Sequence, residues 1–99
     1  MSIIQFTRFK SDKSEEMVKA AKRAKALFEK HGAEYLRLSR FHTGIWAGEW
    51  LAVSRYPSWS AYGQAQERLA KDPEFQKLLA ELPAFCELTA RNISVGVDL

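Results

Sequence analysis

The sequence predicts a small α+β domain with the element order β-α-β-β-α-β, in which a four-stranded antiparallel sheet carries both helices on one face. Apolar residues recur at every third or fourth position between Met17 and Phe28, and again between Tyr62 and Leu82, as in amphipathic helices. Apolar, β-rich segments flank and separate these two stretches. Because β-α-β crossovers are right-handed, both helices are expected on the same face of the sheet. The 99 residues fit a single domain, 1–99.

The first part of the chain is predicted to form a strand followed by a long helix. Ser2–Lys10 is apolar and suits a strand. Ser11 and Asp12 offer side-chain oxygens for the N-cap of the helix that follows. Gly32 is typical of the residue that ends a helix.

The middle of the chain predicts a hairpin and the start of a second helix. Residues 34–43 and 48–56 read as two strands, and Pro57 ends the second. Ser58 or Ser60 can cap the next helix. Asp72-Pro73-Glu74 indicates a fresh helix start, and residues 84–97 are expected to form the last strand.

Alternation of side chains across the sheet assigns two faces. The face under the helices is expected to carry Ile4, Phe6, Leu36, Leu38, Leu51, Val53, Leu88 and Ala90. The opposite face is expected to carry Gln5, Thr7, Phe9, Tyr35, Arg37, Ser39, Phe41, Trp50, Ser54, Tyr56, Thr89 and Arg91. This register sets Trp50 opposite Phe41 and Tyr56 opposite Tyr35; a slip of one residue would reverse it.

The second face predicts self-association. Its aromatic side chains would form a large exposed apolar patch in a monomer. The economical cover is the same face of a second copy, so the expected partner is the chain itself, as a homodimer.

Composition excludes several classes of protein. The formal net charge is +3, from 15 Lys and Arg against 12 Asp and Glu, so the excess is mild. Many lysines lie between Lys10 and Lys30 among glutamates, which favours a solvated helix face over nucleic-acid binding. No segment is apolar enough to span a membrane. Cys86 is the only cysteine, and the N-terminus lacks secretory features, so we expect a cytoplasmic protein with a free thiol.

Two stretches resemble the dimeric α+β barrel superfamily, which has a ferredoxin-like fold. They are Trp50–Tyr62 (WLAVSRYPSWSAY) and Asp72-Pro73-Glu74-Phe75. The resemblance is to the antibiotic-biosynthesis monooxygenase-like proteins and covers nearly the whole chain by element order. It implies a ligand pocket between facing sheets and, for an enzyme, cofactor-independent oxidation of an aromatic substrate.

The haem-degrading members of this superfamily have Asn, Trp and His side chains at positions where this chain has other residues. By position, Thr7 stands where they have Asn and Tyr56 where they have Trp. Residues 58–82 contain no histidine, so no haem or other cofactor is expected.

The remaining reactive residues favour structural roles. His31 follows a predicted helix end, where it would interact with the helix dipole, and His42 lies near the hairpin tip. The two histidines have no cysteine or paired carboxylates at ligand spacing, so no metal site is predicted. Cys86 resembles a small buried hydrophobe, and Glu87 is expected at the surface.

The predicted ligand pocket draws on the second face. Its candidate residues are Thr7, Tyr35, Arg37, Ser39, Phe41, Trp50, Ser54, Tyr56 and Arg91. An arginine among aromatic rings suits a carboxylate, phenolate or enolate. The alternative is that Arg37 and Arg91 pair with glutamates across a dimer interface.

Three functions remain open at this stage. In an oxygenase, Trp50 and Tyr56 would wall the pocket, Arg37 would stabilise the anionic substrate, and Thr7 or Ser39 would orient it. A non-catalytic module for assembly or ligand sensing would instead have no ligand-sized cavity. An isomerase or decarboxylase would need a general base, which the sequence does not identify.

Overall fold

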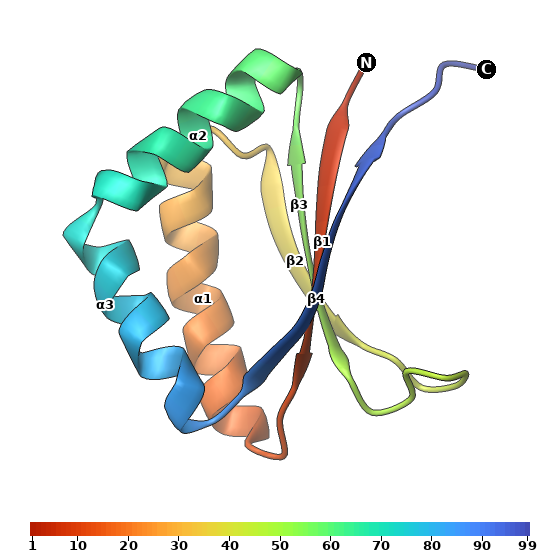
Figure 1. The fold of residues 1–99 in the computed structure, drawn as a ribbon, viewed down its shortest axis with the longest axis vertical. Helices are drawn as coiled ribbons and strands as arrows, with labels where there is room; N and C mark the ends of the chain where they lie inside the picture. Colours follow the sequence, from red (N-terminus) through yellow and green to blue (C-terminus); the bar gives the residue numbers. More distant parts are fainter.

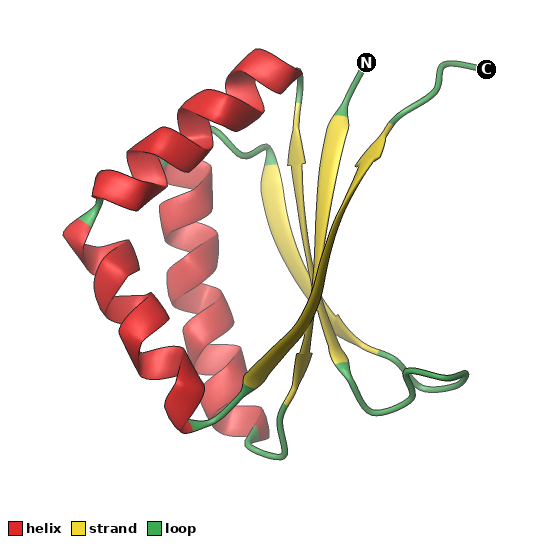
Figure 2. Ribbon diagram, viewed as in Figure 1, coloured by secondary structure: helices red, strands yellow, loops and turns green.

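The computed structural model describes all 99 residues, and its elements follow the predicted order (Figures 1 and 2). The elements are β1 (Ile3–Lys10), α1 (Ser14–Lys30), β2 (Tyr35–Arg40), β3 (Trp50–Tyr56), α2 (Trp59–Lys71), α3 (Pro73–Glu81), a 3₁₀ turn (Leu82–Ala84) and β4 (Glu87–Val95). The second predicted helix is therefore two helices, α2 and α3, divided at the predicted restart.

The four strands form one antiparallel sheet in the order β2-β3-β1-β4. All the helices cover one face of this sheet, and the other face is uncovered (Figure 1). The ferredoxin-like fold class predicted from the sequence is confirmed.

Two of the helix starts have the predicted caps. The Ser58 hydroxyl accepts a hydrogen bond from the Ala61 N–H, and the Asp72 carboxylate accepts one from the Glu74 N–H. The start of α1 differs from the prediction, because Lys13 occupies its N-cap without a side-chain hydrogen bond. Ser11 lies outside the helix, where its hydroxyl donates to the Phe85 carbonyl and accepts from the Lys13 N–H.

The predicted strand register is wrong by one residue. In the β2–β3 hairpin Arg40 pairs with Trp50, and Tyr35 pairs with Arg55. The predicted faces of β2 are right, since Leu36 and Leu38 lie under the helices, but those of β1 and β3 are exchanged. Both strands carry apolar residues on each face, so the prediction placed the more polar face of each strand away from the helices. This placement was wrong because the polar residues face an internal cavity.

The uncovered surface of the sheet is called the open face below. The register of β1, β3 and β2 places nine side chains on this face: Ile4, Phe6, Arg8, Leu51, Val53, Arg55, Tyr35, Arg37 and Ser39. Ile4, Phe6, Leu51 and Val53 were predicted to lie under the helices and are only half-buried here. They lie on the open face because Gln5, Thr7 and Ser54 alternate with them and line the cavity on the helix side.

A β-bulge changes the alternation along β4. Arg8 pairs with Ala90 and Phe9 pairs with Leu88, so Thr89 is the extra residue. Leu88 and Arg91, three positions apart, consequently both line the cavity on the helix side. Leu88 was predicted there, whereas Arg91 was predicted on the opposite face.

The fully buried part of the core lies where α1 and α2 meet the sheet. Ile3, Ala33, Tyr56 and Ala65 form this cluster, with exposed fractions of 7% or less. Phe28, Ala61 and Tyr62 are half-buried residues packed against it. Tyr56, predicted on the opposite face, is thus a core residue.

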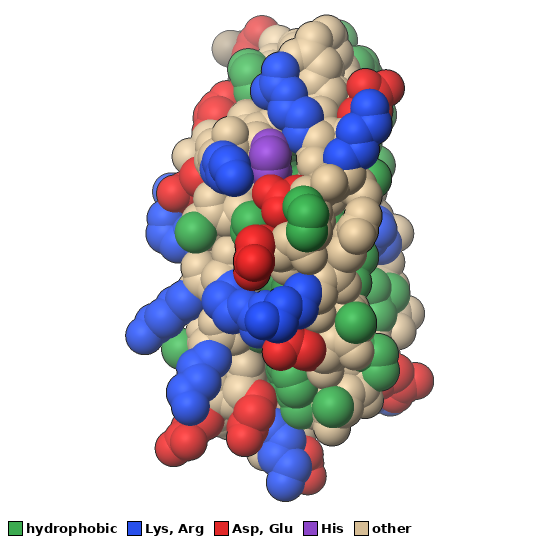
Figure 3. Space-filling view, turned by 90° about the vertical axis from the view of Figure 1, so that its left-hand side faces the viewer, with side chains coloured by type: hydrophobic (Ala, Val, Ile, Leu, Met, Phe, Trp, Pro, Cys, Tyr) green, Lys and Arg blue, Asp and Glu red, His purple; other side chains and the backbone are tan.

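The outer surface of the helices carries interleaved basic and acidic side chains (Figure 3). Arg23 of α1 pairs with Glu81 of α3 at 2.7 Å, and Lys25 pairs with Glu29 within α1. This mixture agrees with a solvated helix face. None of the helices combines the length and apolar character needed to cross a membrane.

Candidate functional site

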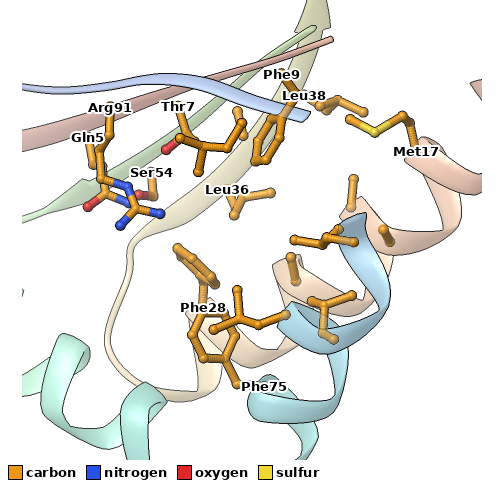
Figure 4. Close-up of a pocket in the computed structure, with 18 residues that line it drawn as sticks. Gln5, Thr7, Phe9, Met17, Phe28, Leu36, Leu38, Ser54, Phe75 and Arg91 are labelled. Atoms are coloured by element: carbon orange, nitrogen blue, oxygen red, sulfur yellow. The ribbon is translucent and has the colours of Figure 1, made fainter. Parts of the chain in front are cut away.

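A cavity lies between the sheet and the helices of the single chain (Figure 4). Its free volume is about 100 Å³. For comparison, an engineered protein cavity of about 150 Å³ binds benzene. The cavity lining consists of Gln5, Thr7, Phe9, Met17, Ala20, Ala21, Ala24, Phe28, Leu36, Leu38, Ala52, Ser54, Phe75, Leu78, Leu79, Leu82, Leu88 and Arg91.

Most of this lining is apolar, and 14 of the 18 residues are hydrophobic. Phe28 of α1 and Phe75 of α3 pack edge to face with ring centroids 5.8 Å apart. The small side chains of Ala20, Ala21 and Ala24 leave free space along α1. This part of the cavity suits the hydrocarbon body of a small molecule.

Four polar residues gather at one end of the cavity (Figure 4). Gln5 and Thr7 come from β1, Ser54 from β3 and Arg91 from β4; together they are called the polar end. Gln5 pairs with Ser54, and Thr7 pairs with Arg91, so the four side chains share the helix-facing side of three adjacent strands. Gln5, Thr7 and Ser54 are buried, with exposed fractions of 4%, 6% and 2%.

Arg91 is the only charged residue in the cavity lining. It is exposed, and no carboxylate of the chain pairs with it, although five other basic residues and His31 form ion pairs. An unpaired guanidinium beside apolar walls attracts an anion, with which it can form charge-assisted hydrogen bonds. The polar end therefore has the chemistry of an anion-binding subsite.

Two packed tyrosines, the buried Tyr56 and the half-buried Tyr62, lie behind the polar end. The Tyr62 hydroxyl of α2 donates to the Gln5 side-chain carbonyl at 2.8 Å. Tyr56 packs edge to face on Tyr62 with ring centroids 5.1 Å apart, and its hydroxyl is buried without a hydrogen bond. Burial raises the pKa of Tyr56 above its ordinary value of 10.0, although Ser54, Gln66 and Arg91 act in the opposite direction.

Tyr35, Arg37 and Ser39 of β2 lie on the open face, away from this cavity, and Phe41 follows the end of β2. The Arg37 guanidinium lies over the Tyr35 ring at 4.0 Å from the centroid. Ser39 is exposed, and Phe41 packs on Trp46 with centroids 5.5 Å apart. The structure thus separates Tyr35, Arg37, Ser39 and Phe41 from Thr7, Ser54 and Arg91.

Trp50 lies on the helix side and not, as predicted, on the open face. It pairs with Phe9, which lines the cavity, and its indole N–H donates to the Ser11 carbonyl at 3.2 Å. Trp50 therefore anchors the β1–α1 loop and is absent from the cavity lining. Its misplacement follows from the one-residue register slip.

Several lining residues were not among the predicted site residues. Gln5 was expected on the same face as Thr7 but without a site role, while Phe28 and Phe75 were read only as helix-face residues. The available signal was the joint occurrence of large rings and three alanines on α1, which predicts space between α1 and the sheet.

The other titratable side chains lie outside the cavity lining. His31 Nε2 hydrogen-bonds Asp72 Oδ2 at 2.7 Å, which joins the end of α1 to the start of α3. His42 is exposed in the hairpin loop. The Cys86 thiol donates to the Leu82 carbonyl at 3.3 Å, and burial raises its pKa. No three His, Cys, Asp or Glu side chains are grouped to hold a metal ion.

Comparison with known proteins gives matches only among solved structures. No family model and no curated protein matches the chain. SnoaB, a cofactor-independent oxygenase from Streptomyces nogalater, matches with a TM-score of 0.76 and 15% identity over 99% of this chain and 95% of that chain. A NIPSNAP family protein from Agrobacterium tumefaciens matches with a TM-score of 0.76 and 14% identity over the same shares.

The chain has the dimeric α+β barrel fold. A NIPSNAP domain protein from Burkholderia xenovorans agrees, with a TM-score of 0.75 and 20% identity over 98% of this chain and 95% of that chain. The predicted superfamily resemblance is confirmed at the level of the fold. At these identities the likeness concerns the fold, and function has to be argued from the site.

Proposed function

We propose that this chain binds a small aromatic molecule with an acidic group in the cavity between its sheet and helices. The observation that carries the proposal is the unpaired Arg91 guanidinium at the polar end of an otherwise apolar cavity. The ring would lie against Phe28 and Phe75, and the anionic oxygen would lie beside Arg91. The chain's cavity of about 100 Å³ suits one ring better than a large polycyclic molecule.

The test of binding is a calorimetric titration with two probes of similar size and opposite charge. Benzoate carries its charge on oxygens that Arg91 can donate to, whereas benzylammonium repels Arg91. We expect benzoate to bind and benzylammonium not to bind. Equal affinity for the two probes would contradict an anion-binding role for the polar end.

A reaction with dioxygen, without a cofactor, is the catalytic form of this proposal. Its support is the fold shared with SnoaB, together with a cavity whose cation would stabilise a phenolate. A phenolate is electron-rich enough to reduce dioxygen itself. For resorcinol, a single electron-rich ring, one oxygen atom would become the new carbonyl oxygen of 2-hydroxy-1,4-benzoquinone, and the other would leave as water with the two displaced hydrogens.

Oxygen consumption tests the reaction. The protein, incubated with resorcinol in air, should consume one dioxygen for each 2-hydroxy-1,4-benzoquinone formed, and chelators should not slow this consumption. Binding of benzoate together with no consumption above the protein-free rate would leave the binding proposal standing and contradict the oxygenase proposal.

We also propose that the functional assembly is a homodimer formed through the open face. Its half-buried Ile4, Phe6, Leu51 and Val53 make an apolar strip that water contacts in the single chain. Arg37 has no acidic partner within the chain and lies on this face. Under this proposal Tyr35, Arg37, Ser39 and Phe41 belong to the subunit contact.

A further inference from the structure

The hydrogen bond between Tyr62 and Gln5 fixes a polar group of the cavity. The Tyr62 hydroxyl donates to Gln5 Oε1 at 2.8 Å, and Gln5 is 4% exposed and lines the cavity. Edge-to-face packing on Tyr56 at 5.1 Å and on Trp59 at 6.1 Å holds the Tyr62 ring between two neighbours. The hydroxyl is therefore held in place by the packing of its own ring.

This hydrogen bond decides which end of the Gln5 amide is free. A glutamine amide has one acceptor oxygen and an NH₂ group with two donors. With its oxygen engaged by Tyr62, the Gln5 NH₂ group has no hydrogen-bond partner in the chain. Turning the amide over would make the Tyr62 hydroxyl accept from the NH₂ group and expose the oxygen to the cavity; the structure has the other arrangement, in which the hydroxyl donates to the oxygen.

We propose that Tyr62 is a positioning residue that makes Gln5 a pure donor, so that the cavity selects a head group with two adjacent acceptor oxygens, such as a carboxylate. This inference rests on the proposed function, because it concerns the ligand of the same cavity. The Gln5 NH₂ group serves one oxygen of the head group, and the Arg91 guanidinium serves the other.

The strand register brings these two donors to one place. Thr7 pairs with Arg91, and Gln5 lies two positions from Thr7 on the same side of β1, so Gln5 and Arg91 are diagonal neighbours. Diagonal side chains on adjacent antiparallel strands are about 7–8 Å apart at their bases, a span that long side chains can bridge with a small group between them. Figure 4 shows Gln5, Ser54 and Arg91 gathered together at this end.

The other polar groups of the polar end act alike in the wild type and in the Gln5 and Tyr62 variants. Arg91 only donates and favours an anionic head group in each of them, whereas the Thr7 and Ser54 hydroxyls can each donate or accept. No carboxylate lines the cavity. A change in selection between these variants thus reports the orientation of the Gln5 amide. A site whose polar groups would be left unpaired rejects the mismatched ligand strongly.

Benzoate and benzamide form the matched pair of probes for this selection. They share ring and shape, but benzamide replaces one acceptor oxygen by an NH₂ donor. The experiment measures the ratio of their affinities by calorimetry for the wild type, Tyr62→Phe and Gln5→Met. Tyr62→Phe removes only the hydroxyl and keeps the ring packing and the charge of the cavity. Tyr35→Phe, on the open face, is the matched control.

The benzoate preference should fall about tenfold in Tyr62→Phe and in Gln5→Met, because a free amide can turn its oxygen toward the ligand and methionine has no donor. In the Gln5→Met background, Tyr62→Phe should have no additional effect, since Tyr62 acts through Gln5. Tyr35→Phe should leave the ratio unchanged.

Two results overturn the inference in distinguishable ways. A wild type that binds neither probe overturns the proposed function and this inference with it. Benzoate binding with a ratio that stays the same in Tyr62→Phe and Gln5→Met leaves the proposed function standing and removes the positioning role of Tyr62.

Discussion

At the scale of single residues, the proposed ligand site depends on the position of one arginine. In the sequence, Arg37 and Arg91 cannot be told apart, since each lies in a predicted strand and alternation assigned both to the same face of the sheet. The extra residue Thr89 turns Arg91 toward the helices, whereas Arg37 stacks on Tyr35 on the open face. A bulge depends on cross-strand pairing, so the sequence of β4 alone did not reveal it.

Tyr56 provides a prediction at the same scale. Burial raises the pKa of Tyr56 above 10.0, so the folded state retains the phenol proton longer than the unfolded chain does. Tyr56 then contributes fully to stability below pH 10.0, and the protein loses stability as the pH rises from 10.0 toward the folded pKa. A difference titration of phenolate absorbance, wild type minus Tyr56→Phe, should have its midpoint above 10.0. A midpoint at or below that value would show that Tyr56 is not desolvated as described.

At the scale of elements, the starts of α2 and α3 were predictable, whereas the faces of β1 and β3 were not. Ser58 and Asp72 cap their helices as expected because the cap is a local contact between a side chain and an amide two or three residues away. The faces of β1 and β3 depend on which side the helices pack, which is a long-range choice. The polar residues Gln5, Thr7 and Ser54 argued for the outer face and instead line the cavity.

Asp72 joins two elements and makes the fold sensitive to acid. The His31 hydrogen bond, followed by the Glu74 N–H, holds the pKa of Asp72 below its ordinary value of 3.8. Its contribution is therefore complete above pH 3.8 and is lost as the pH falls toward the folded pKa, because the unfolded chain takes up the proton first. Asp72→Asn keeps a capping side chain but removes this charge.

The melting temperature of Asp72→Asn should consequently fall less than that of the wild type when the pH is lowered from about 5 to about 2. Asp12→Asn, in an exposed position before α1, is the control and should follow the wild type. Identical dependence of melting temperature on pH for Asp72→Asn and the wild type would contradict a stabilising role for the charged Asp72 carboxylate beside His31.

At the scale of the whole molecule, one side of the sheet is covered and the other is not (Figure 1). The element order was sufficient to predict this arrangement, because right-handed crossovers place both helix segments on one face. The location of the cavity was not predictable in the same way. It depends on how far the helices stand from the sheet, which the packing of Phe28, Phe75 and the α1 alanines determines.

The uncovered side predicts the assembly. Sedimentation equilibrium at micromolar concentration should give twice the 11.3 kDa mass of one chain. Val53→Lys places a charge at the centre of the open face, between Phe6 and Arg37, and should give a folded monomer. Lys22→Ala, on the exposed surface of α1, should remain a dimer. A wild-type monomer with native circular dichroism would show that the open face needs no cover.

The central claim is that the ligand's acidic group binds Arg91 inside the chain. Calorimetric titration of benzoate into the wild type, Arg91→Met and Arg37→Met tests it most directly, since both variants remove one guanidinium from a strand. Losing a charge-assisted hydrogen bond costs about 1.5–3 kcal/mol, so Arg91→Met should bind benzoate roughly 10-fold to 150-fold more weakly, and Arg37→Met should bind it like the wild type. Undiminished binding by Arg91→Met together with loss of binding by Arg37→Met would contradict the account and place the ligand on the open face, between subunits.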